Sequence, residues 1–461
     1  MLFQSLGFVC VFLPAVICLY YALKRVEAVR EWMLIGASAI FYGWWDPRFL
    51  PLIFGQTVIS WVVAKYFHQS RHLLLLGITA NLAILVYFKY LNFFADTITG
   101  LTGYEVGPFN IILPIGISFY SFQIISYLAD LRKGQASLYE FRRFVLYITF
   151  FPQLIAGPIV RHQEFIPQLL EAPLRPGLWN RIWTGLVLFV LGFTMKVFFA
   201  DELAPVSDRV FELAATAKPS FIEAWTGALA FSLQLFFDFS AYSAMAIGIG
   251  LMMGIRFPDN FNAPYKARNI QDFWRRWHMT LSRFFRDYMY IPLGGNRNGP
   301  LIYVAASLAT MGLCGLWHGA AWTFVVWGLM HGIGLIVVKA WGRFGFPLPF
   351  LAAWLLTMVF VIVGWVLFRS PDFDTATRML SAMAVPDVSV AIQDFGANFS
   401  IGTVGLFLAT MLAVFGPTSK SLTRDGAATG TGTALAVSTA LVLGLVYISS
   451  GQPATFIYFQ F

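Results

Sequence analysis

Thirteen apolar runs along the chain approach or exceed the ~20 residues that a helix needs to cross the hydrocarbon core of a bilayer. Hydrophobic residues make up 58% of the 461 positions and charged residues only 12%, whereas about 25% of an ordinary soluble domain is charged. The sequence therefore predicts an all-α polytopic membrane protein, with residues 1–461 forming one integral domain. The runs lie at 3–23, 31–45, 49–67, 73–94, 109–129, 143–157, 179–200, 223–253, 299–317, 319–338, 350–368, 399–417 and 432–450.

The run 143–157 is short and contains Pro152 and Gly157, so we expect a re-entrant segment rather than a crossing. With that reading, every basic loop falls on the cytoplasmic side, as the positive-inside rule requires. The result is about twelve crossings, within a total of 11–13 transmembrane or re-entrant helices, with both termini outside. The net charge of +8 is then explained by cytoplasmic loops, and no nucleic acid is expected as a partner. The basic loops are 24–30, 65–72, 131–143, 256–298, 339–343 and 418–425, and the neutral or acidic ones are 96–108, 201–223 and 369–398.

His318 is the strongest candidate for a catalytic residue. Ionisable groups inside membrane segments are costly and are functional candidates by default. Trp317 stands beside this histidine, and Gly315 and Gly319 flank it. Small residues permit close backbone approach, and an aromatic wall limits water. Desolvation favours the neutral imidazole, the form that accepts a proton from a hydroxyl. The alternative from position alone is a structural histidine that is hydrogen-bonded between helices.

The other histidines give weaker signals. For His278, in WRRWHMTLSRFFRD, an interfacial position and a role in the site are equally compatible with the sequence. His331 favours packing, because a straight helix would place it about 220° around the axis from His318. His162 follows the re-entrant segment and is a candidate to line a cavity. Carboxylates at ligand spacing are missing around these histidines, so we expect no metal site.

A basic stretch precedes the apolar run at 299–317. If residues 272–287 form one helix, four arginines share a face about 100° wide. One interpretation is an amphipathic helix on anionic headgroups. A more specific interpretation, compatible with the first, is an entrance that binds the phosphates of coenzyme A or of a phosphopantetheine carrier. The four residues are Arg275, Arg276, Arg283 and Arg286.

Long motifs in this part of the chain resemble the membrane-bound O-acyltransferase family, in its bacterial branch whose members act on alginate, peptidoglycan, cellulose or teichoic acids. They are FWRRWHMTLSRFFRDYMYIPLGG and GLWHGAAWTFVVWGLMHG. LPIGISFYSFQIISYLAD and FPQLIAGPIVRHQEF fit the same branch. The resemblance covers about residues 1–370, whereas 371–461 contains generic spans.

The resemblance implies a helical bundle around a central tunnel, with His318 as the catalytic histidine of the WHG motif and His278 as the second motif residue. A thioester donor, acetyl-CoA or an acyl-carrier thioester, would arrive from the cytoplasm, and no cofactor would be bound permanently. Acetyl would pass across the bacterial inner membrane to a periplasmic acetyltransferase partner and a polysaccharide acceptor. Residues that we expect to line the tunnel, or else to make structural hydrogen bonds, are Trp317, Asp238, Gln234 and Tyr242.

Several alternatives remain open at this level. His318 would act as a general base or as a transient acyl carrier. Within the enzyme class the runner-up is transfer of D-alanyl or another acyl group to a cell-wall polymer, with an acyl carrier protein as donor. From other classes, a transporter or a scaffold of a polysaccharide-export complex also places polar groups in a membrane.

Overall fold

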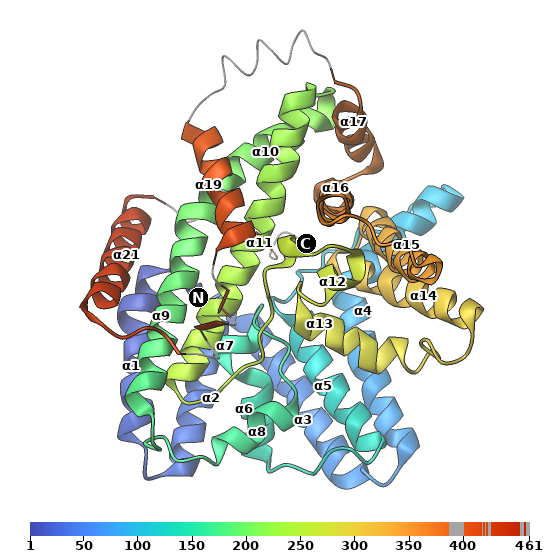
Figure 1. Cartoon of the computed structure of the whole chain (residues 1–461). Coiled ribbons are helices and arrows are strands. Elements are labelled where there is room, and N and C mark those ends of the chain that lie inside the picture. The colour runs from blue at the N-terminus through green and yellow to red at the C-terminus, as the bar shows by residue number, and fades with distance from the viewer. Residues whose placement is uncertain (387–400, 417, 420, 423–425, 452–455, 458–461) are drawn as a thin grey trace. The chain divides into compact units, whose positions relative to one another are not determined.

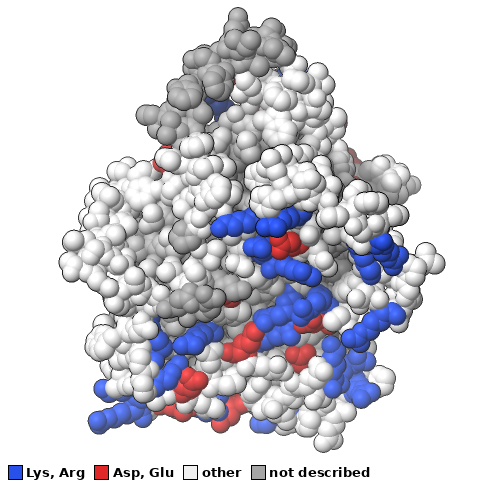
Figure 2. Space-filling view, viewed as in Figure 1, with Lys and Arg blue, Asp and Glu red and all other residues white. Residues whose placement is uncertain are grey.

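The computed structural model describes residues 1–386, 401–416, 418–419, 421–422, 426–451 and 456–457, and these ranges contain helices and no strands. Eight helices are long and apolar enough to cross a membrane, and two shorter apolar helices accompany them. The prediction of an all-α multi-pass protein is therefore confirmed. Figure 2 shows broad areas of the visible surface that carry no Lys, Arg, Asp or Glu, as lipid-facing surface requires. Of the predicted loops, residues 387–398, 420 and 423–425 lie outside the described ranges.

The chain divides into two compact units. It passes between them within helices α9 (Leu178–Met195) and α11 (Phe221–Met252), and again after residues 259, 421 and 449. The first unit comprises Met1–Phe193, Tyr242–Asp259 and Leu422–Ser449. Its α-helices, labelled in Figure 1, are α1 (Leu13–Ala22), α2 (Glu27–Gly43), α3 (Leu50–Phe67), α4 (Arg71–Thr102), α5 (Ile117–Arg132), α6 (Phe141–Thr149), α7 (Phe151–Leu154), α8 (His162–Leu169), α9 (Leu178–Met195) and α21 (Thr431–Ser450). Two further short helical segments are η1 (Phe8–Phe12) and η2 (Pro47–Phe49).

The segment 143–157 is broken, as the sequence predicts. Helices α6 and α7 contain nine and four residues, whereas a crossing helix needs about 20. The backbone groups at the break find partners inside the protein: Phe151 N–H donates to Ser38 Oγ at 3.1 Å, and Gln153 Nε2 donates to Tyr147 O at 2.5 Å. A broken helix at membrane depth is stable only when its freed polar groups are satisfied in this way.

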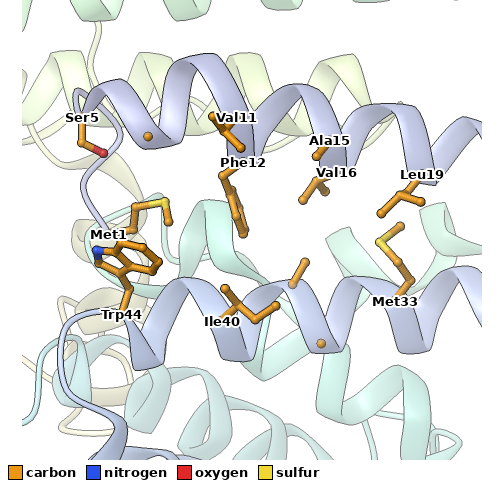
Figure 3. A pocket seen from close by; sticks show the side chains of 13 residues that line it. Met1, Ser5, Val11, Phe12, Ala15, Val16, Leu19, Met33, Ile40 and Trp44 are labelled. Carbon is orange, nitrogen blue, oxygen red and sulfur yellow. The ribbon is translucent and has the colours of Figure 1, made fainter.

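An apolar groove of about 760 Å³ runs between η1–α1 and α2 (Figure 3). Val11, Phe12 and Leu19 line one side, and Met33 and Ile40 line the other. None of the histidines lines it.

The second unit comprises Thr194–Ala241, Asn260–Ser421 and Ser450–Phe461. It holds the two motifs that contain His278 and His318, FWRRWHMTLSRFFRDYMYIPLGG and GLWHGAAWTFVVWGLMHG. Its elements are η3 (Lys196–Ala200), α10 (Asp201–Thr216), most of α11 (Phe221–Met252), η4 (Pro264–Lys266), α12 (Ile270–Trp274), α13 (Met279–Phe285), η5 (Arg286–Tyr290), α14 (Pro300–His318), α15 (Trp322–Phe344), α16 (Phe350–Arg369), α17 (Phe373–Ala384) and α19 (Ile401–Phe415).

Two local expectations are wrong. The region 201–223 is mostly helix α10, which continues α9 through the π-helical turn η3, rather than a loop. Residues 272–287 do not form one helix, because His278 has φ +41° and separates α12 from α13. The turn is held from outside: Asn262 N–H donates to Arg276 O, and Met279 N–H donates to Asn260 O, both at 2.9 Å. The predicted single face for the four arginines therefore does not exist.

Helices α14 and α15 lie side by side as a hairpin (Figure 1). A Cβ on Gly315 would lie 2.1 Å from Phe324 O, and a Cβ on Gly328 would lie 2.1 Å from Met311 O. Only glycine permits this approach of two backbones. The close approach predicted at Gly315 is confirmed, and it positions the end of α14.

Candidate active site

His318 is the last residue of α14 and is 2% exposed. Aromatic rings surround its imidazole: the centroid of Trp317 lies at 4.8 Å, and those of Trp327 and Phe368 both lie at 5.2 Å. Gly319, which follows, has no room for a side chain, because a Cβ there would lie 2.1 Å from the ring of Phe324. The WHG sequence therefore ends the helix in a compact turn that encloses the imidazole.

His278 lies close to His318 in space, although 40 residues separate them in the sequence. Their ring centroids are 6.5 Å apart. Phe239 of α11 packs edge-on against His278 at 4.6 Å, and Trp317 lies at 5.9 Å from it. Burial lowers the pKa of His278 to about 3, so its imidazole is neutral at physiological pH. Two buried histidines thus share one aromatic enclosure.

Asn260 is a site residue that the sequence analysis missed. It is fully buried, and its Oδ1 lies 3.0 Å from His278 Nδ1. The same oxygen accepts hydrogen bonds from Thr280 N–H at 3.3 Å and from Thr280 Oγ1 at 2.9 Å. Asn260 stands in PDNFNAPY, a polar stretch between apolar runs. That context gives no signal by which to separate it from its polar neighbours.

A pocket of about 370 Å³ adjoins the WHG turn. The ring of Phe368 forms part of its wall and also contacts the ring of His318. Arg369 contributes a guanidinium, which pairs with Asp208 at 2.8 Å. Both polar and apolar residues line the pocket. They are Gly319, Ala320, Ala321, Thr323, Phe324, Phe368, Arg369, Ser370 and Pro371.

Asp238 belongs to a buried ion cluster that the sequence analysis did not predict. Lys196 Nζ lies 3.0 Å from Asp238 Oδ1 and 2.6 Å from Asp201 Oδ1. Ile457 N–H donates to Asp238 Oδ2 at 2.7 Å. All three charged side chains are less than 10% exposed. The sequence did contain a signal for this cluster: Lys196 stands inside the apolar run TMKVFFADE, and a charged residue in such a run needs a partner of opposite charge.

The remaining tunnel candidates lie on α11 but in different surroundings. Gln234 is buried in the second unit, and its Oε1 has no hydrogen-bond partner among the described residues. Tyr242 belongs to the first unit, where its ring stacks on Phe3 at 4.5 Å. Their assignment to a tunnel stays a prediction.

The four arginines occur on both sides of His278. Arg275 and Arg286 are exposed, and Arg286 pairs with the adjacent Asp287 at 2.7 Å. Arg276 is half-buried and pairs with Asp272 at 2.9 Å. Arg283 is half-buried on α13. The basic residues therefore flank the turn that carries His278 rather than forming one helical stripe.

Two further histidines are held by neighbouring side chains. Trp274 Nε1 donates to His331 Nδ1 at 3.3 Å, which fits the predicted packing role of this residue. In the first unit, His162 lies between the hydroxyl of Tyr139 at 2.9 Å and Asp130 Oδ2 at 3.2 Å. In the part of the chain that the structure describes, no three side chains gather in a way that could hold a metal ion.

Comparison with known proteins identifies the family. The sequence model of the membrane-bound O-acyltransferase family matches residues 57–369, which include both histidines and the WHG turn. The peptidoglycan O-acetyltransferase of Helicobacter pylori is 40% identical over 422 residues, covering 83% of this chain and 80% of that protein. The probable alginate O-acetylase AlgI of Pseudomonas aeruginosa is 41% identical over 400 residues, covering 83% and 75%.

A more distant relative carries a different acyl group in its name. The teichoic acid D-alanyltransferase of Streptococcus thermophilus is 30% identical over 240 residues, covering 50% of this chain and 57% of that protein. The resemblance seen in the sequence motifs is thus confirmed over most of the chain. The chain belongs to the membrane-bound O-acyltransferase family and is a multi-pass O-acyltransferase.

Proposed function

We propose that the protein moves acetyl from a cytoplasmic thioester, acetyl-CoA or an acyl-carrier thioester, through the bacterial inner membrane for O-acetylation of an exported polysaccharide. The observation that carries the proposal is the enclosure of His318 and His278 within 6.5 Å of each other, both buried. The names of the two acetylating relatives support acetyl as the group and a polysaccharide as the acceptor.

His318 supplies general base catalysis in this proposal. It takes the proton from an acceptor hydroxyl while the oxygen attacks the thioester carbonyl. A C–O bond forms, the C–S bond breaks, and the proton passes from the imidazole to the departing thiolate. In the alternative route the imidazole carries the acetyl transiently. The rings of Trp317, Trp327 and Phe368 exclude water, so the thioester reacts with the hydroxyl rather than hydrolysing.

The acceptor hydroxyl enters through the pocket beside the WHG turn. This pocket lies at the carboxyl end of α14 and shares the ring of Phe368 with the enclosure of His318. A polysaccharide or a partner acetyltransferase on the periplasmic side presents its hydroxyl there.

Filling this pocket tests the acceptor route. Ala320→Trp places a large ring in a space of about 370 Å³. We expect the KM for the acceptor to rise about tenfold or more, while the KM for the donor stays within about twofold, because one lost favourable contact of 1.4 kcal/mol corresponds to tenfold. Steady-state transfer with each substrate varied in turn measures both. An unchanged acceptor KM would place the acceptor elsewhere.

The donor end is tested on the exposed arginines. Arg275→Gln/Arg286→Gln removes two charges that would bind the phosphates of the donor, so the donor KM should rise about tenfold. Arg343→Gln, an exposed arginine at the end of α15, is the matched control and should leave the donor KM unchanged. Equal effects of the two changes would indicate a general charge effect instead of a donor site.

Transfer assays with the purified protein in vesicles identify the acyl group that it transfers. Acetyl-CoA, an acetyl carrier thioester and a D-alanyl carrier thioester are supplied in turn, and transfer to polysaccharide is measured by mass analysis. Acetyl transfer supports the proposal. Transfer of D-alanine alone would instead make the chain functionally similar to the D-alanyltransferase relative.

A further inference from the structure

Three hydrogen bonds converge on one atom of Asn260. Its Oδ1 lies 3.0 Å from His278 Nδ1, 3.3 Å from Thr280 N and 2.9 Å from Thr280 Oγ1. The backbone of Asn260 also takes part, because its carbonyl accepts Met279 N–H at 2.9 Å. One buried asparagine thus holds the turn around His278 by hydrogen bonds to both its side chain and its main chain.

The backbone N–H of Thr280 settles the orientation of this amide. An asparagine amide is ambiguous by itself, because its oxygen and nitrogen are hard to tell apart. A backbone N–H can only donate, so the atom that it reaches at 3.3 Å is the oxygen. An oxygen of this kind can only accept. His278 Nδ1, 3.0 Å from the same oxygen, must therefore carry the hydrogen.

We propose that Asn260 is a positioning residue that holds His278 as the Nδ1-protonated tautomer and thereby keeps the lone pair of Nε2 as an acceptor in the active site. Nε2 is buried and has no hydrogen-bond partner among the described residues. A neutral imidazole with one nitrogen donating has the other as an acceptor. The role in transfer rests on the proposed function, whereas the tautomer rests on geometry alone.

The consequence for the reaction is a second acceptor near His318. The ring centroids of the two histidines are 6.5 Å apart, so one substrate hydroxyl can reach either imidazole with a hydrogen bond of about 2.8 Å. The hydroxyl has a single proton, which Nε2 of His278 accepts as a hydrogen bond while the acceptor docks. The O–H bond then turns to His318, which takes the proton as the oxygen attacks the thioester. The φ of +41° at His278 is rare for a residue other than glycine, and the grip of Asn260 stabilises it.

Nitrogen NMR of protein labelled with ¹⁵N-histidine tests the tautomer directly, with the His278 signals identified by their loss in His278→Gln. We expect Nδ1 protonated and Nε2 unprotonated between pH 6 and pH 9. Protonated Nε2 in the neutral ring would overturn the assignment. This measurement needs no change at Asn260.

Kinetics test the positioning role. Asn260→Ala should lower kcat about 100-fold, as loss of an oriented acid–base group does, with the donor KM within about threefold. Asn260→Asp keeps the accepting oxygen, so it should retain activity within about tenfold. Its carboxylate favours the charged imidazole, so the acid limb of the pH–rate profile should move to higher pH.

Asn262→Ala is the matched control. Asn262 stands two positions away, is only half-buried and contacts the turn through its backbone N–H, so kcat should be unchanged. Normal kcat in Asn260→Ala, or an unmoved profile in Asn260→Asp, would overturn the positioning role. An active His318→Gln variant would instead overturn the proposed function, whatever the tautomer of His278.

Discussion

His318→Ala is expected to lower acyl transfer by about 1,000-fold or more while the protein still accumulates in the membrane. General acid–base catalysis alone contributes about 10²–10⁴-fold, and His318 is the histidine that lies beside the pocket proposed for the acceptor. Transfer is measured per mole of folded protein, so that a change in expression is not mistaken for a change in rate. His318→Gln fills more of the aromatic enclosure and should be equally inactive.

His331→Gln is the matched control for this loss. His331 is also a fully buried histidine of the same unit, but it accepts a hydrogen bond from Trp274. A glutamine oxygen can still accept that bond, so activity should stay within about threefold. If both histidine changes abolish transfer, packing of the unit rather than catalysis explains the result. If neither does, the catalytic assignment of His318 is wrong.

Lys196→Met should have the largest effect on stability. It leaves the carboxylates of Asp201 and Asp238 buried without the ammonium that lies 2.6 Å and 3.0 Å from them. Removing one partner of a buried ion pair costs about 3–5 kcal/mol, which is a large part of the stability of a typical protein. Thermal unfolding in detergent, followed by size exclusion, should show a lower midpoint and less folded protein.

Charge balance predicts how the cluster can be repaired. Two carboxylates and one ammonium carry a formal charge of −1, so Asp238→Asn leaves a neutral pair and should cost only about 1 kcal/mol. The asparagine oxygen can still accept Ile457 N–H, which Asp238 Oδ2 accepts at 2.7 Å. Lys196→Met/Asp201→Asn/Asp238→Asn should recover most of the stability lost in Lys196→Met. A Lys196→Met variant as stable as the wild type would show that the cluster does not stabilise the fold.

The surroundings of His318 could be predicted from the sequence because they depend on residues next to it in the chain. Gly315 lies in the last turn of α14 and Gly319 directly follows the helix, and both make close contacts with Phe324. The break within 143–157 was also predictable, since proline removes a backbone donor and glycine lowers helix propensity in a run that is already short.

The basic stretch shows where local reasoning failed. Periodicity assigned residues 272–287 to one helix, but two backbone hydrogen bonds, accepted by Asn260 O and donated by Asn262 N–H, hold a left-handed turn at His278. Helix propensity is a weak preference of less than about 1 kcal/mol per residue, and tertiary hydrogen bonds outweigh it. No local sequence pattern predicts that Asn260, 18 positions from His278, makes these hydrogen bonds.

The sequence alone determined that the chain is helical and lies in a membrane, because apolar runs with so few charges have no other stable environment. The tertiary structure alone decided the partners of the buried polar groups. Asn260 meets His278, and Lys196 meets Asp238, across 18 and 42 positions. A polar group in an apolar interior must find a partner, but the packing of the helices determines which residue that partner is.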